Sequence, residues 1–242
     1  MNTRIRLFFT APIFALLLML FSGCTATPPT PAEGLSIPEI YQELLLDYEN
    51  LVSYRLSEEF TEYYKNENMI PLSDSLKEAL SETKEWSNLL VEMTYGGKYL
   101  TRESYGYILQ DINGDNFPEL FWVRADHHVL AIFTVFEEKL YLLDAFWPKH
   151  DCYVGDSWEL CVIDPGGAYY DDYKIKRLEA NSPALVTVKE FGKDNGNYYE
   201  ASETGERISV TEARMEELRT QYPVYKMGAR WENIPIQFLS PS

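Results

Sequence analysis

The stretch YILQDINGDNFPELFWV, residues 107–123, sets a polar, oxygen-rich segment between two apolar runs. Both runs are rich in aromatic and aliphatic side chains, as strands usually are. Asn113-Gly114 supplies a strong signal for a tight turn. The stretch therefore predicts a β-hairpin whose turn carries the polar side chains.

The turn of this hairpin is a candidate metal site. Asp111, Asn113 and Asp115 alternate in the sequence, so a tight loop can point all three side chains at one hard cation. The backbone carbonyl of Phe117 and the carboxylate of Glu119 close the far side. Oxygen ligands at this spacing suit calcium, and we expect the ion to be a structural cofactor that pins the hairpin.

The loop has two other interpretations. An EF-hand is excluded, because it needs a glycine and an acidic residue where this chain has Asn116 and Trp122. A loop without metal stays open as an alternative. In that case Asn113-Gly114 makes a β-turn and the acidic side chains accept hydrogen bonds from the backbone.

The N-terminus predicts export and a lipid anchor. Arg4 and Arg6 precede an apolar run from Leu7 to Phe21 that is short for a membrane span. The run ends at Leu20-Phe21-Ser22-Gly23-Cys24, which resembles the lipobox of bacterial lipoproteins, where the cysteine receives a diacylglycerol. An ordinary secretory signal with a coincidental cysteine is the alternative.

These features divide the N-terminal part of the chain. We expect residues 1–23 to be a lipoprotein signal peptide, Cys24 to be the lipidation site, and residues 24–35 to be a flexible linker rich in Pro and Thr. The protein is then extracytoplasmic and lipid-anchored to a bacterial membrane.

The lipobox and the hairpin together resemble uncharacterised bacterial surface lipoproteins with a single Asp-Ile-Asp-Gly-Asp-Gly-x-Pro-Glu-Leu hairpin, and the loop is similar to those of FG-GAP-like repeats. The resemblance implies calcium ligands at Asp111, Asn113, Asp115, Phe117 (by its carbonyl) and Glu119. Asn116 replaces a glycine and Asn113 an aspartate of the pattern. These changes imply a weaker affinity, in the range of about 0.1 to 1 mM.

The composition limits the partners. The chain has 242 residues and a formal net charge of -17, and residues 1–23 contain two arginines and no acidic residue. A surface of this charge repels phosphate backbones, so we expect no nucleic-acid partner. The expected partners are the membrane, through the N-terminal lipid, and an unknown protein, peptide or glycan ligand.

Cys152 and Cys161 form an even pair in an exported, oxidising setting, which favours a disulfide. If Asp156-Ser157 makes a two-residue turn, Cys152 lies opposite Cys161 at a closely spaced position that a bridge fits. Two free, buried cysteines are the alternative.

The apolar periodicity predicts the fold class. Helices begin at Ser36 and at Ser73, the second ending at Gly96-Gly97, and a last helix begins at 209–212 with Met215 and Leu218 buried. Strand-like runs lie at 104–110, 119–124, 129–136, 139–146, 150–155, 158–163, 172–178, 184–191 and 197–201, and an extended tail at 231–239. We expect residues 36–242 to form one α+β domain: N-terminal helices packed on an antiparallel β-meander sheet, with a short C-terminal helix.

The sequence shows no motif that identifies a reaction. The pair His127-His128 could suggest zinc, but neighbouring residues of a strand point to opposite faces. We expect a non-catalytic binding or interaction role. The alternative is a cell-envelope hydrolase acting on glycan or peptide, which needs a cleft with two converging carboxylates. The candidate tyrosines for a ligand groove, which otherwise pack the sheet, are Tyr169, Tyr170, Tyr173, Tyr198 and Tyr199.

The lipobox leads to a first prediction. Cys24→Ser removes the thiol that accepts the lipid, so we expect the variant to lose membrane attachment or to stay unprocessed. Membrane fractionation and electrophoretic mobility measure both effects. A variant that fractionates and migrates like the unaltered protein contradicts the anchor.

Overall fold

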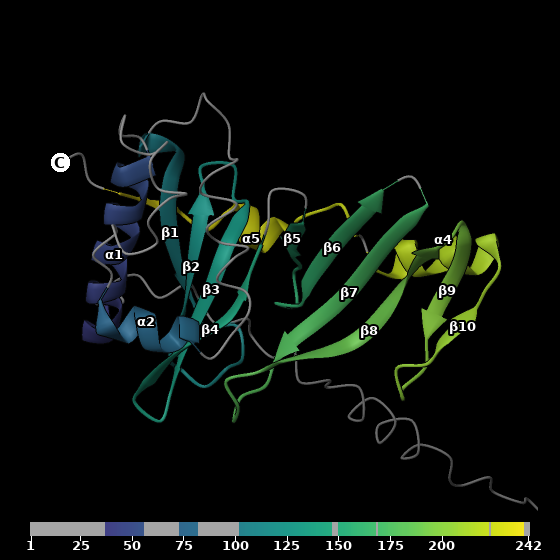
Figure 1. Ribbon diagram of the computed structural model, residues 1–242, viewed down its shortest axis with the longest axis horizontal. Coiled ribbons are helices and arrows are strands. Elements are labelled where there is room, and N and C mark those ends of the chain that lie inside the picture. The colour runs from purple at the N-terminus through teal and green to yellow at the C-terminus, as the bar shows by residue number, and fades with distance from the viewer. Residues whose placement is uncertain are drawn as a thin grey trace, which may run out of the picture. The chain divides into compact units, whose positions relative to one another are not determined.

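Figure 1 shows the computed structural model, in which residues 37–55, 73–81, 102–146, 150–167, 169–222 and 224–239 are described. The chain divides into two units, Met1–Leu35 and Ser36–Ser242. The predicted signal peptide, Cys24 and the linker lie outside the described residues. Within the described ranges, no helix combines the length and the apolar character that a membrane span needs.

The helices and strands have the following bounds. The helices are α1 (Glu39–Arg55), α2 (Asp74–Ser81), the 3-10 helix η2 (Arg102–Ser104), α4 (Glu212–Gln221) and α5 (Ala229–Glu232). The strands are β1 (Tyr105–Gln110), β2 (Glu119–Arg124), β3 (Val129–Phe136), β4 (Lys139–Ala145), β5 (Asp151–Val154), β6 (Leu160–Gly167), β7 (Tyr170–Leu178), β8 (Leu185–Asp194), β9 (Asn197–Ala201), β10 (Arg207–Ser209) and β11 (Gln237–Phe238).

The strands form two antiparallel sheets. The first has the order β11-β1-β2-β3-β4, and the second has the order β10-β9-β8-β7-β6-β5. From β1 to β4 and from β5 to β10, strands that follow one another in the chain are neighbours in a sheet. Connections too short for a crossover helix produce this antiparallel order.

The predicted α+β class, with N-terminal helices packed on one meander sheet, is wrong. The described chain is mostly antiparallel β in two sheets, with few short helices. The nine predicted strand-like runs match β1 to β9, so the error lies in how the strands are grouped. After β4 the chain enters the second sheet. The alternation of apolar residues predicts which side chains of a strand are buried, but it does not indicate which strand pairs with it. The predicted end of the second helix at Gly96-Gly97 lies outside the described residues.

Helix α1 is bound to one face of the first sheet by aromatic contacts. Tyr48 stacks on Trp122 of β2 with ring centroids 4.3 Å apart, and Trp122 packs on Phe133 of β3 at 4.7 Å. Tyr41 donates a hydrogen bond to the carbonyl of Pro118 at 2.9 Å, next to the predicted metal loop. The helix thus covers the hairpin that carries the loop.

Side chains of both sheets share a second apolar cluster. It includes Phe121 of the first sheet, Val154 of the second sheet and Trp231 of α5, all fully buried. Lys176 of β7 also reaches Asp144 of β4, with Nζ 2.6 Å from Oδ2. Apolar burial and the ion pair between Lys176 and Asp144 therefore connect the two sheets.

Helix α4 covers one face of the second sheet, as Figure 1 shows beside β8 and β9. Thr211 caps the helix by accepting a hydrogen bond from the N–H of Arg214, and Met215 and Leu218 are buried, which confirms the predicted helix. Arg214 donates two hydrogen bonds of 2.9 Å to Glu200 of β9. These bonds, together with a hydrogen bond from Lys189, lower the pKa of Glu200 to about 2.

The extended tail predicted over 231–239 is wrong in part. Trp231 belongs to the short helix α5 and is buried, while β11 pairs with β1 and forms an edge of the first sheet. Gly106 of β1 lies opposite Phe238, and a Cβ atom on Gly106 would lie 2.6 Å from the carbonyl oxygen of Gln237. The close approach of the two strands therefore requires a glycine at this position.

The register of the β5–β6 hairpin differs from the predicted one. Cys152 lies opposite Val162, and Tyr153 lies opposite Cys161, because the turn is one residue longer than expected. Neighbouring residues of a strand point to opposite faces, so the two thiols lie on opposite faces of the second sheet. Both cysteines are free and buried. The predicted pairing geometry is wrong, and the disulfide between Cys152 and Cys161 loses its geometric support.

This register leads to a second prediction. The intact mass of unreduced protein should show no deficit of two protons. Alkylation should be slow in the folded state, because burial raises the pKa of Cys161 to about 12 and raises that of Cys152 as well. After unfolding in guanidinium without a reductant, both thiols should be alkylated. A two-proton deficit that disappears on reduction contradicts the register.

Candidate functional site

The loop between β1 and β2 is closed by the side chain of Asp111. Its Oδ1 accepts a hydrogen bond from the N–H of Gly114 at 2.6 Å, and its Oδ2 accepts one from the N–H of Asn116 at 3.0 Å. Gly114 and Asn116 have left-handed φ angles of +81° and +69°. Asparagine tolerates this region better than most residues, so Asn116 takes the conformation that the FG-GAP-like pattern assigns to glycine.

A second set of bonds joins the other predicted ligands. Asn113 Oδ1 accepts from the N–H of Asp115 at 3.0 Å, and Asn113 Nδ2 donates to Asp115 Oδ2 at 2.9 Å. Asp115 Oδ1 accepts from the N–H of Phe117 at 2.7 Å. The structure therefore brings Asp111, Asn113 and Asp115 into one small loop, as both interpretations of the sequence require.

The donor set of this loop is chemically suited to a hard cation. Each carboxylate oxygen of Asp111 and Asp115 accepts one of the hydrogen bonds above, and a carboxylate oxygen has two lone pairs. In the described part of the chain, however, no group of three or more His, Cys, Asp or Glu side chains is placed to hold a metal. Calcium binding stays a prediction.

Glu119 differs from the other predicted ligands because it is fully buried. Its Oε2 accepts a hydrogen bond from the N–H of Ile112 at 2.9 Å, and its Oε1 lies 3.1 Å from the hydroxyl of Thr134. Burial raises the pKa of Glu119 to about 8, and the nearby carboxylates add to the rise. Both carboxyl oxygens therefore accept hydrogen bonds, one from the N–H of Ile112 and one from the hydroxyl of Thr134, and these two bonds limit the rise of the pKa.

The candidate tyrosines separate into two groups. Tyr173 and Tyr199 are buried, and Tyr198 packs against the apolar cluster beneath α4, as the packing alternative expects. Tyr169 and Tyr170 are 66% and 42% exposed, at the end of the second sheet. The sequence pattern could not separate them, because tyrosine is common in both settings.

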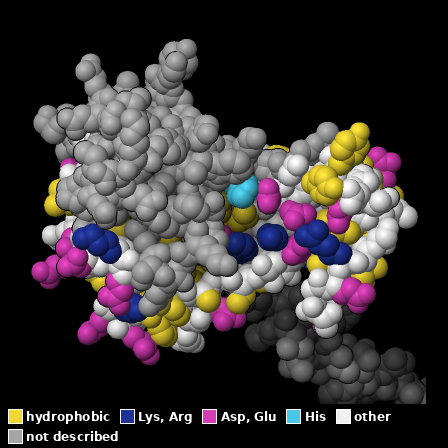
Figure 2. Space-filling model, viewed as in Figure 1, with side chains coloured by type: hydrophobic (Ala, Val, Ile, Leu, Met, Phe, Trp, Pro, Cys, Tyr) yellow, Lys and Arg dark blue, Asp and Glu magenta, His cyan; other side chains and the backbone are white. Residues whose placement is uncertain are grey.

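The face of the second sheet opposite α4 carries a charge cluster that the sequence analysis missed. Arg207 Nη2 lies 3.0 Å from Asp172 Oδ2 and 2.9 Å from Glu190 Oε1, and its guanidinium lies over the ring of Tyr199. Tyr199 donates to Asp172 across Gly192, where a Cβ atom would clash with the carbonyl oxygen of Asp171. Figure 2 shows basic and acidic side chains alternating over this part of the surface.

The three histidines lie in separate surroundings. His127 Nε2 lies 2.9 Å from the carbonyl oxygen of Ile234, and His150 Nε2 lies 3.1 Å from Asp164. His128 is buried, and burial lowers its pKa. His127 and His128 lie in the turn before β3 and not in a strand, and Nδ1 of His128 lies 3.7 Å from Asp151, so the two rings have different partners.

Glu119 leads to a third prediction. Its folded-state pKa of about 8 lies above the ordinary 4.5, so its stabilising protonation is present below pH 4.5 and is lost as the pH rises through 8. Glu119→Gln keeps a neutral group that can make both hydrogen bonds. In a chelator, the variant should match the unaltered protein at pH 5 and exceed its free energy of unfolding at pH 9 by about 4 kcal/mol, since each of the roughly three pH units between pH 5 and the folded-state pKa contributes about 1.4 kcal/mol.

Urea unfolding at the two pH values measures this difference. Glu203→Gln is the matched control, because Glu203 is exposed in the turn before β10 and lies far along the chain from the loop. The control should change stability equally little at both pH values. A Glu119→Gln variant that gains nothing between pH 5 and pH 9 contradicts the protonated, buried carboxyl.

Comparison with protein-family models, with curated proteins and with solved structures finds no match for this chain. Three features of the described residues bear on function: the loop from Asp111 to Glu119, the exposed pair Tyr169 and Tyr170, and the cluster around Arg207.

Proposed function

We propose that the protein is a lipid-anchored, extracytoplasmic binding module of a bacterial membrane, with a structural calcium ion in its first hairpin and no catalytic role. The lipobox at 20–24 supports the anchor. The observation that carries the binding role is the contrast within the second sheet. Charged side chains on one face are paired with each other, whereas Tyr169 and Tyr170 at its end are exposed.

The charge cluster favours binding over the alternative of a cell-envelope hydrolase. Asp172 and Glu190 converge, which is the arrangement that a glycosidase needs, but both contact the same nitrogen of Arg207. A hydrolase keeps the space between its two carboxylates open for the scissile bond and a water molecule. Here the guanidinium lies in that space, so the cluster supports a structural role for the two acids.

The hydrogen-bonded loop supports the calcium part of the proposal. The side chains of Asp111, Asn113 and Asp115 are already ordered by the loop backbone, so little conformational entropy remains to be lost when an ion binds. Glu119 can join them only after it loses its proton. We therefore infer a site of modest affinity, in agreement with the two departures from the FG-GAP-like pattern.

Calcium titration tests this function. If the ion binds only the folded state, the free energy of unfolding should rise by about 2.7 kcal/mol at a calcium concentration of one hundred times the dissociation constant. Asp115→Ala removes a central ligand and should abolish the rise. Thermal unfolding followed from about 1 µM to about 10 mM calcium covers the expected affinities.

Two controls separate binding from general charge screening. Glu203→Ala removes one exposed carboxylate outside the loop and should leave the calcium response intact. Magnesium at equal ionic strength should give a smaller rise, because it prefers a stricter octahedral geometry. A melting temperature that ignores calcium, or an Asp115→Ala variant that responds like the unaltered protein, returns the loop to the metal-free interpretation.

A further inference from the structure

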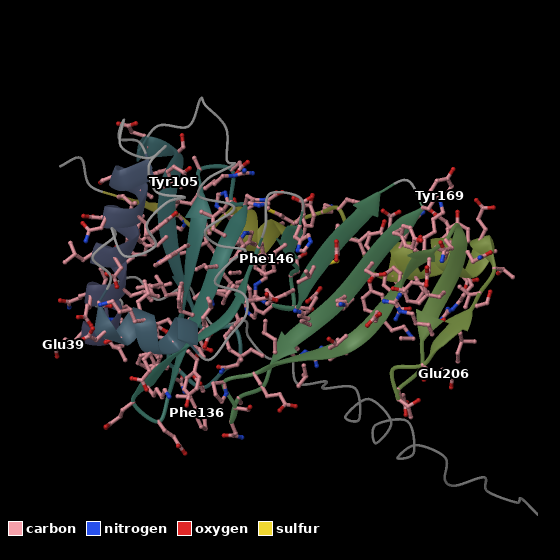
Figure 3. All side chains as sticks on the ribbon, in the orientation of Figure 1. Glu39, Tyr105, Phe136, Phe146, Tyr169 and Glu206 are labelled. Atoms are coloured by element: carbon pink, nitrogen blue, oxygen red, sulfur yellow. The ribbon has the colours of Figure 1, made fainter. Side chains whose placement is uncertain are left out.

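Two exposed tyrosines lie at one end of the second sheet. Tyr169 precedes β7 and is 66% exposed, and Tyr170, the first residue of β7, is 42% exposed. Figure 3 labels Tyr169 at this end, where its side chain lies outside the sheet. Large exposed aromatic side chains that lie together commonly mark a binding surface.

Hydrogen bonds to a neighbouring turn fix both tyrosines. The N–H of Gly196 donates to the carbonyl of Tyr169 at 3.1 Å, and the hydroxyl of Tyr170 donates to Oδ1 of Asn195. Nδ2 of Asn195 donates in turn to Asp194 at 3.1 Å, so its side-chain amide is held at both ends. These bonds hold the backbone of Tyr169 and the ring of Tyr170 beside one turn. Because the ring of Tyr170 is already ordered, its contribution to binding costs less entropy.

The β8–β9 turn has the geometry of a tight hairpin turn. Asn195 and Gly196 both have left-handed φ angles, +49° and +83°, between the paired residues Asp194 and Asn197. Positive φ at both central positions is the requirement of the tight hairpin turn that Asn-Gly favours. The amide of Asn195 thus has a fixed position beside the ring of Tyr170.

This surface suits a glycan better than a peptide. Strands β7 and β8 are each paired on both sides, so a peptide cannot add a strand at this end of the sheet. Tyrosine rings instead offer flat apolar area with polar edges, which matches the apolar face and the hydroxyl rim of a sugar ring.

The charge of the surroundings selects among glycans. Asp171 lies opposite Lys193 in the β7–β8 pairing, and Oδ2 of Asp194 lies 3.9 Å from Nη1 of Arg207, so the charges beside the tyrosines are balanced. The net charge of -17 on the whole chain opposes an anionic polysaccharide. A neutral sugar carries no such penalty and can donate hydroxyl hydrogen bonds to nearby oxygens.

We propose that Tyr169 and Tyr170, together with Asn195, form a binding site for a neutral glycan. Tyr169 supplies the exposed stacking ring, and Asn195 holds Tyr170 in place. The assignment rests on the proposed binding function and names the class of its ligand.

Isothermal titration calorimetry of the full chain tests the site, in a detergent that lacks a sugar headgroup. Cellohexaose and chitohexaose are the neutral probes, and a hyaluronan hexasaccharide is the anionic one. The neutral probes should bind and the anionic probe should not. Tyr169→Ala should raise the dissociation constant about tenfold or more, as for other aromatic anchors. Tyr170→Phe keeps the ring and loses one hydrogen bond, so we expect about a two- to fivefold rise.

Phe238→Ala is the matched control, because Phe238 is a 52% exposed aromatic residue on β11 of the first sheet. It should leave the dissociation constant unchanged, and all variants should keep the melting temperature. The site is overturned if neither neutral probe binds, or if Tyr169→Ala binds them unchanged. If the protein binds peptides on an array, loses this binding in Tyr169→Ala and binds neither neutral sugar, the glycan site is wrong and the proposed binding function is supported.

Discussion

The register of the first hairpin is the constraint on which the rest of the structure depends. Gln110 lies opposite Glu119, so the hydrogen-bonded loop between them fixes which residues of β2 face each side. Trp122 then faces α1 and stacks on Tyr48, whereas Phe121 faces the cluster shared with the second sheet. Because side chains alternate with a period of two, a slip of one residue would exchange these faces. The loop thus determines which side chains of β2 enter the apolar cluster under α1 and which enter the cluster shared by the two sheets.

The same rule explains what the sequence could and could not predict about the fold. The strand positions follow from local alternation and turn residues, and they were predicted well. The register of the β5–β6 hairpin depends on the length of its turn, and one additional residue moved Cys152 and Cys161 to opposite faces. The division into two sheets depends on contacts far apart in the chain, such as that between Phe121 and Trp231, with ring centroids 4.8 Å apart. No local pattern contains this information.

The same distinction between local patterns and distant contacts decides which parts of the candidate site could be predicted. Asp111, Asn113 and Asp115 meet because they are close in sequence, so their spacing was sufficient. Glu119 is also close in sequence, but its strand directs the side chain toward Thr134 of β3, and the resulting burial raises its pKa. The cluster around Arg207 joins four strands, so no short motif could indicate it. Sequence reasoning found the loop and missed the tertiary contacts that modify its chemistry.

The acidic composition gives these separate features a common physical basis. The chain has 38 acidic and 21 basic residues, and several of the basic ones pair with acids of neighbouring elements. Lys176 pairs with Asp144 between the two sheets, Arg207 with Asp172 and Glu190 within the second sheet, and Arg214 of α4 with Glu200 of β9. Exposed ion pairs contribute little stability individually, so their main effect here is to neutralise carboxylates where strands approach one another. A surface with an excess of carboxylates attracts cations and repels anionic polymers, so the proposed calcium loop and the proposed neutral ligand are both compatible with the charge of the chain.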